Sequence, residues 1–112
     1  MGGHVIVMTT VSSEDEGAKI AHELVGRRLA ACVNVSSPVR SVYRWKGKVE
    51  EATERVLMIK TLRENVDRVK EAIGKLHSYE LPEVVAVPIE AGDETYLNWL
   101  AAMSAEVQTE LP

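Results

Sequence analysis

The sequence has little of what would mark a secreted or membrane-bound protein. Its 112 residues include one cysteine, Cys32, which cannot form a disulfide within the chain, so nothing requires an oxidising compartment. No stretch approaches the roughly 20 apolar residues that span a bilayer, and residues 1–11 lack the basic and apolar regions of a signal peptide. We therefore expect a cytoplasmic protein that does not insert into a membrane.

An excess of positive charge is also absent. Acidic residues outnumber basic ones by 17 to 13, which gives a net charge of −4, whereas a general nucleic-acid binder needs a positive face to neutralise phosphates. Basic and aromatic residues do alternate within residues 40–48, a pattern also found in proteins that bind single-stranded nucleic acid. The acidic residues of 50–54 would face them across a hairpin, and cross-strand charge pairing is the simpler interpretation. The sequence predicts no nucleic-acid partner.

Motifs of the common enzyme classes are missing too. No serine or cysteine nucleophile sits in a sharp strand-to-helix turn, and no glycine-rich loop opens a helix as phosphate-binding enzymes require. Hydrolysis of acyl phosphates would need a phosphate-binding loop after the first strand, but residues 9–16 become acidic there and would repel phosphate. We expect a protein that is not an enzyme and has no catalytic residues.

What the sequence does contain is a regular succession of strand and helix patterns within one domain, residues 1–112. With 46% hydrophobic residues, the chain is long enough to bury a core without disulfides. The patterns predict a strand at 5–11, a helix opened by Ser13, a strand at 32–46 interrupted at 36–38, a strand at 49–61, a helix carrying Val66 to Leu76, a strand at 83–90 and a last helix opened by Asp93. Ser13 with Glu16, and Thr61 with Glu64, have the spacing of capping boxes at the first two helices.

This order of elements is β-α-β-β-α-β followed by a C-terminal helix, which predicts a ferredoxin-like α+β fold. Its four-stranded antiparallel sheet carries helices on one face, and strands 32–46 and 49–61 form a long hairpin. The other face of the sheet stays open. Tyr43 and Trp45 lie on one face of the hairpin, and large aromatic rings favour burial. We therefore expect another copy of the chain to cover this face, as in closed homo-oligomers.

Few residues qualify as ligands. Cys32 is the strongest soft-metal ligand, with His77 as a partner, although a lone cysteine at a strand start is more often a small buried hydrophobe. His77 at a helix C-terminus also interacts favourably with the last carbonyls. Glu80 is a candidate metal ligand or acid–base group, or it accepts backbone N–H bonds where a strand begins. The alternation of strand 49–61 places Lys60 on a face of the sheet that we expect to be largely covered. A lysine there needs a carboxylate partner or a bound anion.

Four segments resemble a known family. "RRLAACVNV" (27–35), "SVYRWKGKVEE" (41–51), "IKT" (59–61) and "HSYELPEVVAVPIEAGDETYLNWL" (77–100) are similar to the CutA family, the divalent-cation tolerance proteins, and the resemblance covers residues 5–103. It implies a ferredoxin-like homotrimer whose long hairpins pair between subunits, and a link to tolerance of copper and other divalent metals.

The resemblance also implies site residues. The metal ligands that it implies are Cys32, His77 and Glu80. The residues that it implies around clefts between subunits are Trp45, Lys60 and Tyr79.

The chain departs from the family pattern at three positions. Ser78 stands where a proline is usual, so this turn gains an N–H and loses a rigid ring. Ala52 stands where an acid is usual, and Arg55 where an apolar residue is usual. The changes at Ala52 and Arg55 weaken a metal site, adjust one face of the hairpin, or were introduced by engineering.

From the resemblance and the ligand types we expect a homotrimer that binds divalent metal ions, copper foremost, since thiolate and imidazole favour copper or zinc over magnesium or calcium. The alternative is a regulatory or scaffold trimer whose inter-subunit cleft binds a small anionic ligand or a protein partner through Lys60 and Tyr79. Loss of binding in Cys32→Ala or His77→Ala variants would indicate the metal binder. Loss in Lys60→Ala alone would indicate the regulator.

Overall fold

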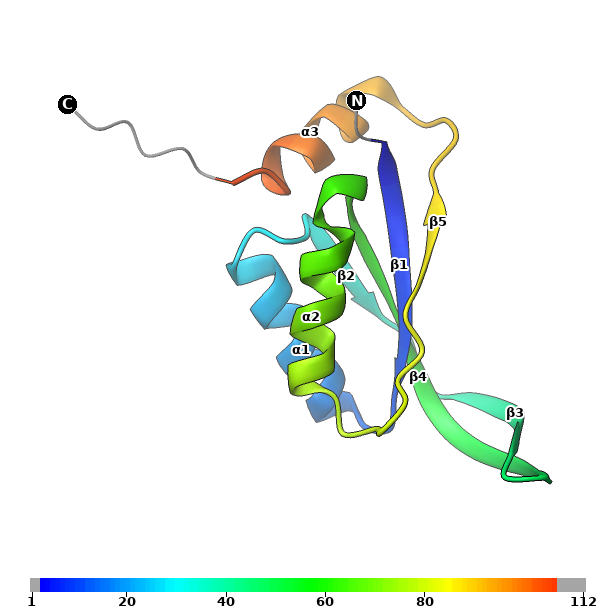
Figure 1. Cartoon of the computed structure of the whole chain (residues 1–112). Coiled ribbons are helices and arrows are strands. Elements are labelled where there is room, and N and C mark those ends of the chain that lie inside the picture. The colour runs from blue at the N-terminus through cyan, green and yellow to red at the C-terminus, as the bar shows by residue number, and fades with distance from the viewer. Residues whose placement is uncertain (1–2, 107–112) are drawn as a thin grey trace.

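The computed structural model describes residues 3–106 and confirms the α+β fold that the sequence predicts (Figure 1). In chain order the elements are β1 (His4–Val11), α1 (Glu14–Gly26), β2 (Cys32–Val35), β3 (Val39–Trp45), β4 (Lys48–Leu62), the short 3-10 helix η1 (Arg63–Asn65), α2 (Val66–Leu76), β5 (Val85–Pro88) and α3 (Glu94–Met103). Pro38 lies in the interruption between β2 and β3, where its missing N–H breaks no ladder. The sheet therefore has five strands instead of the expected four.

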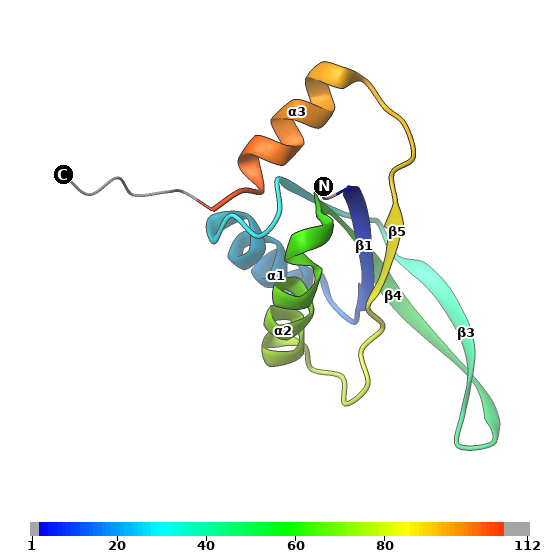
Figure 2. The same ribbon diagram turned by 45° about the horizontal axis from the view of Figure 1, so that its top comes forward.

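The strands form one antiparallel sheet around the long strand β4. The order across the sheet is β2-β4-β1-β5, while β3 pairs with β4 alone. Residues 55–62 of β4 pair with β1, and residues 48–54 pair with β3. Helices α1 and α2 lie side by side on one face of the sheet (Figures 1 and 2). The β3–β4 hairpin, residues 39–54, projects beyond these helices and is called the hairpin arm below.

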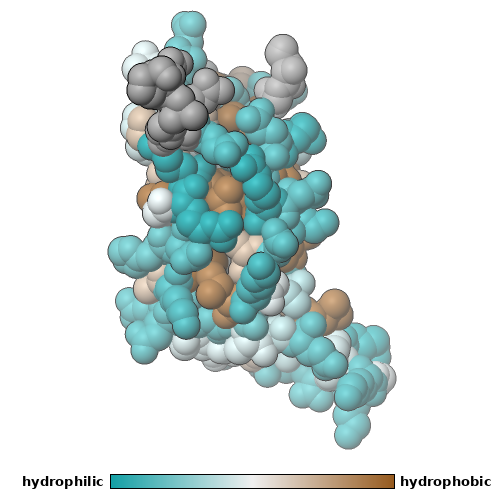
Figure 3. All heavy atoms as spheres, turned by 60° about the vertical axis from the view of Figure 1, so that its left-hand side comes forward, coloured by the Kyte–Doolittle hydropathy of each residue, from teal (hydrophilic) through white to brown (hydrophobic). Residues whose placement is uncertain are grey.

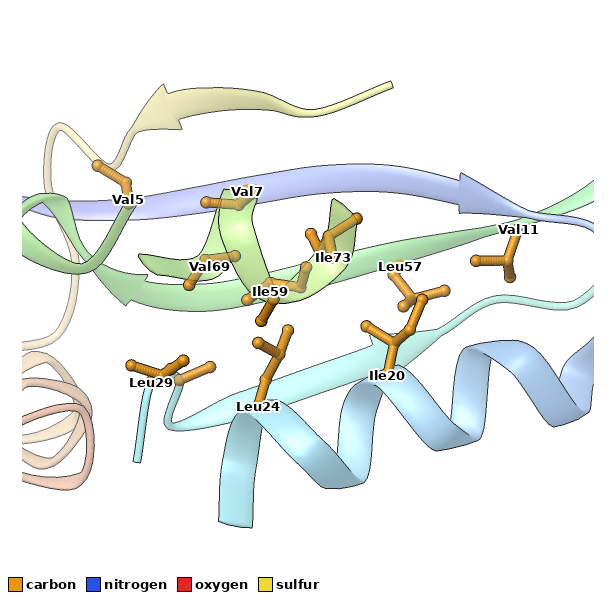
Figure 4. Packing of buried hydrophobic residues seen from close by; sticks show 12 residues of the cluster. Val5, Val7, Val11, Ile20, Leu24, Leu29, Leu57, Ile59, Val69 and Ile73 are labelled. Atoms are coloured by element: carbon orange, nitrogen blue, oxygen red, sulfur yellow. The ribbon is translucent and has the colours of Figure 1, made fainter. Parts of the chain in front are cut away.

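The core lies between the sheet and the two helices (Figure 4). Alternate residues of β1 and β4 point toward the helices, as the two-residue period of a strand requires. The fully enclosed side chains include Val5, Val7 and Val11 of β1, Leu57 and Ile59 of β4, Ile20 and Leu24 of α1, and Val69 and Ile73 of α2. Each such side chain stabilises the fold by about 1.5–3 kcal/mol relative to its exposed state.

The helix caps agree with the sequence in two of three cases. The Ser13 side chain accepts a hydrogen bond from the Glu16 N–H at 3.1 Å, and the Asp93 side chain accepts one from the Tyr96 N–H at 2.9 Å. The predicted Thr61 cap is wrong. Thr61 is buried and its hydroxyl donates to the Leu29 carbonyl at 2.6 Å, so α2 is entered through η1 instead. Capping-box spacing does not reveal whether a threonine still belongs to the preceding strand.

A two-residue turn closes the hairpin arm. Lys46 and Gly47 join Trp45 to Lys48 and have φ values of 51° and 81°. Positive φ at both central positions is the type I′ geometry, which matches the right-handed twist of the flanking strands and suits glycine. The two strands of the arm therefore continue their pairing to the tip.

The face of the sheet opposite the helices is left open. Residues paired directly across strands share a face, so the register places Met8 and Val85 beside Met58, and Ile6 and Val87 beside Lys60. Met58 and Val87 are each 40% exposed and Val85 is 45% exposed. By contrast, the helix-covered side of the molecule has a mostly hydrophilic surface (Figure 3). The single chain thus exposes apolar side chains on its sheet, as the expected cover by another copy requires.

Within residues 3–106, no helix is long and apolar enough to cross a membrane.

Candidate functional site

A cavity of about 640 Å³ lies where the hairpin arm leaves the sheet. Its walls come from β1, from both strands of the arm and from the segment between α2 and β5, which passes the base of the arm (Figure 1). The residues that line it are Thr10, Ser41, Val42, Tyr43, Trp45, Glu54, Tyr79, Glu80, Leu81 and Glu83. Its volume falls in the range of roughly 300–1,000 Å³ that is typical of small-molecule sites.

Tyr79 and Glu54 connect the two sides of this cavity. The Tyr79 hydroxyl donates to Oε2 of Glu54 at 2.6 Å, and Glu54 is only 8% exposed. Burial, and after it the hydrogen bond to Glu54 and its charge, raise the pKa of the Tyr79 phenol above its usual value of 10.0. The phenol thus stays protonated and keeps donating to the carboxylate at neutral pH.

His77 holds the chain in place just before Tyr79. Its buried ring donates from Nε2 to the Thr10 carbonyl at 2.7 Å, and its Nδ1 accepts from the Tyr79 N–H at 3.0 Å. An Nδ1 that accepts a hydrogen bond carries no proton, so this arrangement requires the neutral Nε2–H tautomer. Both ring nitrogens are occupied in the single chain, which leaves neither lone pair free for a metal ion.

Ser78 has a partner for the N–H that a proline would lack. Its N–H donates to Oε2 of Glu16 at 2.6 Å and its hydroxyl donates to Oε1 at 3.1 Å. Burial raises the pKa of the Glu16 carboxyl, but the Ser78 hydrogen bonds and the nearby His77 outweigh burial and leave this pKa below its usual 4.5. The departure at position 78 therefore ties the turn to the first turn of α1.

Cys32 lies elsewhere on the open face. It starts β2 directly opposite Lys60, is partly exposed, and places its Sγ 4.0 Å from Oδ1 of Asn34. His77 instead contacts Thr10, which pairs with Val56 of β4. Positions 56 and 60 of one strand are about 13 Å apart, so one chain does not bring Cys32 and His77 together.

The third expected ligand, Glu80, lines the cavity rather than approaching Cys32. Among residues 3–106, no group of three or more His, Cys, Asp or Glu side chains is placed to hold a metal ion. The metal set of Cys32, His77 and Glu80 therefore stays a prediction, and only an assembly of several chains could complete it.

The expected cleft residues separate into two groups. Trp45 and Tyr79 line the cavity, whereas Lys60 does not. Sequence reasoning missed Tyr43 and Glu54 as lining residues. Strand alternation could have identified Glu54. The arm pairs Trp45 with Lys48 and Tyr43 with Glu50, so the even-numbered residues of β4, Glu54 among them, share the face of those two rings.

The other two departures from the family pattern lie near the base of the arm. Arg55 donates to the Ser36 carbonyl at 3.1 Å and lies 3.9 Å from the Glu14 carboxylate. It thus fixes the bend between β2 and β3 against the start of α1. Ala52 pairs with Ser41, and nothing in the structure explains the alanine there.

Comparison with known proteins agrees with the fold and the motifs. The family model described as CutA1 divalent ion tolerance protein matches residues 5–103. The divalent-cation tolerance protein CutA of Thermus thermophilus is 45% identical over 95 residues, which are 85% of this chain and 92% of that protein. The chloroplastic protein CutA of Arabidopsis thaliana is 41% identical over 96 residues, which are 86% of this chain but only 53% of that protein.

The structural comparison gives the same result. The solved structure of the divalent cation tolerance protein (Cut A1) from Thermus thermophilus has a TM-score of 0.89 with this fold. It is 42% identical in sequence, and the match covers 91% of this chain and 99% of that one. Family model, sequence and structure agree over nearly the whole chain, which therefore belongs to the CutA1 family of divalent ion tolerance proteins.

Proposed function

We propose that this protein contributes to divalent-cation tolerance by binding metal ions, copper foremost and zinc second, as a cytoplasmic homotrimer without catalytic activity. Relatives of this chain carry the name divalent-cation tolerance protein, which supports the general role. The observation that carries metal binding is the position of Cys32. The single thiol is partly exposed on the open face of the sheet rather than enclosed in the core. Thiolate sulfur is a protein ligand that favours copper and zinc over magnesium and calcium.

The site needs more than one copy of the chain. Structural zinc sites take four ligands, and residues 3–106 of one chain hold no group of three. A closed homo-oligomer brings equivalent side chains together around its axis or across its interfaces. The exposed apolar residues Met58, Val85 and Val87 lie on the same face as Cys32 and favour such an association.

His77 and Glu80 contribute differently to this proposal. Glu80 is exposed, so its carboxylate is accessible to a metal ion held by a neighbouring copy. His77 can ligate only after one ring nitrogen releases the Thr10 carbonyl or the Tyr79 N–H. Metal binding through His77 would therefore loosen the turn before β5, and we expect Cys32 to dominate the affinity.

The test is calorimetric titration of the metal-free protein with Cu²⁺ and Zn²⁺ at pH 7.5, beside light scattering for the mass of the assembly. We expect saturable binding by a particle of three chains, loss of most affinity in Cys32→Ala, and a smaller loss in His77→Ala. His22→Ala is the matched control, because His22 is exposed on α1. Binding that is absent, or unchanged in Cys32→Ala, would contradict the proposal.

A second candidate function is that of a regulatory or scaffold trimer that binds a small ligand in an inter-subunit cleft. The cavity of about 640 Å³ favours it, because Trp45 and Tyr79, two of the three expected cleft residues, lie in its wall. This function predicts that Tyr79→Leu removes ligand binding and leaves the copper titration unchanged. If Tyr79→Leu instead keeps ligand binding and changes the copper titration, the cavity is not a separate ligand site.

A further inference from the structure

The chemistry of the cavity wall indicates which ligand it would accept. Among residues 3–106, three aromatic rings and three carboxylates contribute to the wall, and no lysine, arginine or histidine does. The rings belong to Tyr43, Trp45 and Tyr79, and the carboxylates to Glu54, Glu80 and Glu83. An anion would be repelled by this wall, so the expected anionic ligand does not match the cavity of the single chain.

Glu54 is the innermost of the three acids. Its Oε2 is held by the Tyr79 hydroxyl, while within residues 3–106 its Oε1 accepts no hydrogen bond. None of the three cavity carboxylates forms an ion pair in the same residue range. Glu54 as a residue is only 8% exposed, and a carboxylate in such surroundings is costly without a counter-charge. A bound cation would offset that cost.

The aromatic rings suit a cation that also has an apolar surface. Tyr43 and Trp45 are two residues apart on β3, so both rings point to the face where Glu54 lies. A cation near such a ring is attracted by its π-electrons, most strongly when water is excluded. The Trp45 ring already has one cation near it, because Nζ of Lys46 lies 5.9 Å from the ring centroid.

A bare metal ion fits this cavity less well than an organic cation. A metal ion needs ligand oxygens that converge within about 2–2.6 Å of one point. The acidic side chains of the described residues form no group of three that could hold a metal ion, so the three carboxylates are spread around the wall. Rings and separated carboxylates around a volume of about 640 Å³ instead match a cation of several heavy atoms.

We propose that this cavity binds a small organic cation, an ammonium group carried on methyl or methylene carbons. Glu54 is its counter-ion, and Tyr43 and Trp45 pack against its carbon atoms. Glu80 and Glu83 at the wall raise the local concentration of cations. This inference rests on the second candidate function and names its ligand class, and it is independent of metal binding at Cys32.

The test is calorimetric titration of the full chain, in its native assembly, with choline and with putrescine. The probe for charge is 3,3-dimethylbutan-1-ol, an uncharged compound with the shape of choline. We expect saturable binding of at least one of the two cations and binding of the uncharged compound that is weaker by about tenfold or more. Glu54→Gln and Tyr43→Leu should each weaken cation binding by about tenfold, while Glu64→Gln on η1 is the matched control without effect.

Several results would overturn the inference. The inference fails if neither choline nor putrescine binds to the folded wild-type protein. It also fails if choline and its uncharged analogue bind equally well. Cation binding that appears only in Lys60→Ala would mean that a lysine of a neighbouring copy fills the cavity, and would also overturn it. If circular dichroism shows that Glu54→Gln does not fold, the double variant Glu80→Gln with Glu83→Gln replaces it. These two residues are exposed, and loss of their charges should also weaken cation binding.

The same titrations distinguish a failure of the organic-cation inference from a failure of the small-ligand function or of the metal-binding function. A dicarboxylate such as succinate binding in place of the cations would keep the small-ligand function and reject the ligand class. No binding of any of these compounds would reject both. Copper binding that is lost in Cys32→Ala while choline binding persists would leave the cavity site independent of the metal site.

Discussion

Alternate residues of the same two strands meet different surroundings on the two faces of the sheet. Val7 and Ile59 pair across β1 and β4 under the helices and are fully buried. Met58, the neighbour of Ile59 along β4, points to the other face and is 40% exposed. Both faces carry apolar side chains, and the helices that cover one face account for the different exposure of Ile59 and Met58.

This comparison also separates stability from function. The helix-covered face holds the core, and of the expected ligands His77 lies at the end of α2 with both ring nitrogens already hydrogen-bonded. The open face holds Cys32 and Lys60 at one end, and Glu54 with the rings of Tyr43 and Trp45 at the other. The single thiol and the candidate cavity residues named above therefore lie on the face that the single chain leaves uncovered. Substitutions on the two faces should consequently affect different measurements.

The largest effect on stability is expected under the helices. Ile59→Ala removes three carbon atoms from a fully enclosed side chain that pairs with Val7. It should lower the free energy of unfolding by about 2–5 kcal/mol, because the lost contacts and the remaining cavity both count. Urea unfolding at fixed protein concentration measures this loss. A loss below about 1 kcal/mol would mean that the two faces do not differ as the burial indicates.

A charge on the open face should instead act on assembly. Met58→Asp places a carboxylate among Met8 and Asn34, where water reaches it in the single chain but not under a second copy. Burying an unpaired charge costs several kcal/mol, so the particle mass in light scattering should fall from that of three chains to that of one. The control is Lys70→Asp on the exposed side of α2, which should leave the mass unchanged. An unaltered mass in Met58→Asp would place the interface elsewhere.

The junction between α1 and the segment after α2 should give a pH-dependent effect. In the folded protein the pKa of Glu16 lies below its usual 4.5, so its stabilising contribution is complete above pH 4.5 and is lost as pH falls through the lowered pKa. Glu16→Gln should cost about 1–2 kcal/mol at pH 7, since a charged acceptor of the Ser78 hydrogen bonds is replaced by a neutral one. Denaturation curves of the two proteins should converge as the pH falls through the lowered pKa of Glu16. A difference independent of pH would assign the cost to packing.

The smallest effect is expected on the outer side of α2, away from both faces. A Cβ added at Gly74 would meet no atom within 4 Å. Gly74→Ala should raise the free energy of unfolding by about 0.5–1 kcal/mol, because alanine loses less backbone freedom in a helix. Thermal unfolding followed by circular dichroism is sufficient. A destabilised variant would indicate that something covers this side of α2 in the assembly.

Much of the fold follows from sequence patterns that are local. Period-two alternation located β1 and β4, Pro38 marked the division of the long strand, and Ser13 and Asp93 marked helix starts that the structure confirms. Thr61 shows the limit of such patterns. It has the right spacing for a cap, but its place within the strand β4 decided its partner, the Leu29 carbonyl.

The site was less predictable because its contacts join distant parts of the chain. Glu54 has ordinary acidic neighbours in sequence, and only the return of the chain after α2 brings the Tyr79 hydroxyl to it. His77 was a reasonable metal ligand from its residue type. The two hydrogen bonds that occupy its ring depend on the Thr10 carbonyl and on the backbone turn at Tyr79, and neither has a sequence signature.

The two-residue turn at Lys46 and Gly47 has a consequence for the order of folding. It lets the hairpin arm pair between neighbours in sequence, and hairpins of this kind close within about 1–10 μs. The pairing of β1 with residues 55–62 joins distant segments, and such contacts limit folding rates. We expect Tyr43 and Trp45 to be placed early and the cavity to be completed last. In a Trp99→Phe variant, which leaves Trp45 as the single tryptophan, the fluorescence should then reach its native value only in the slow refolding phase that forms the sheet.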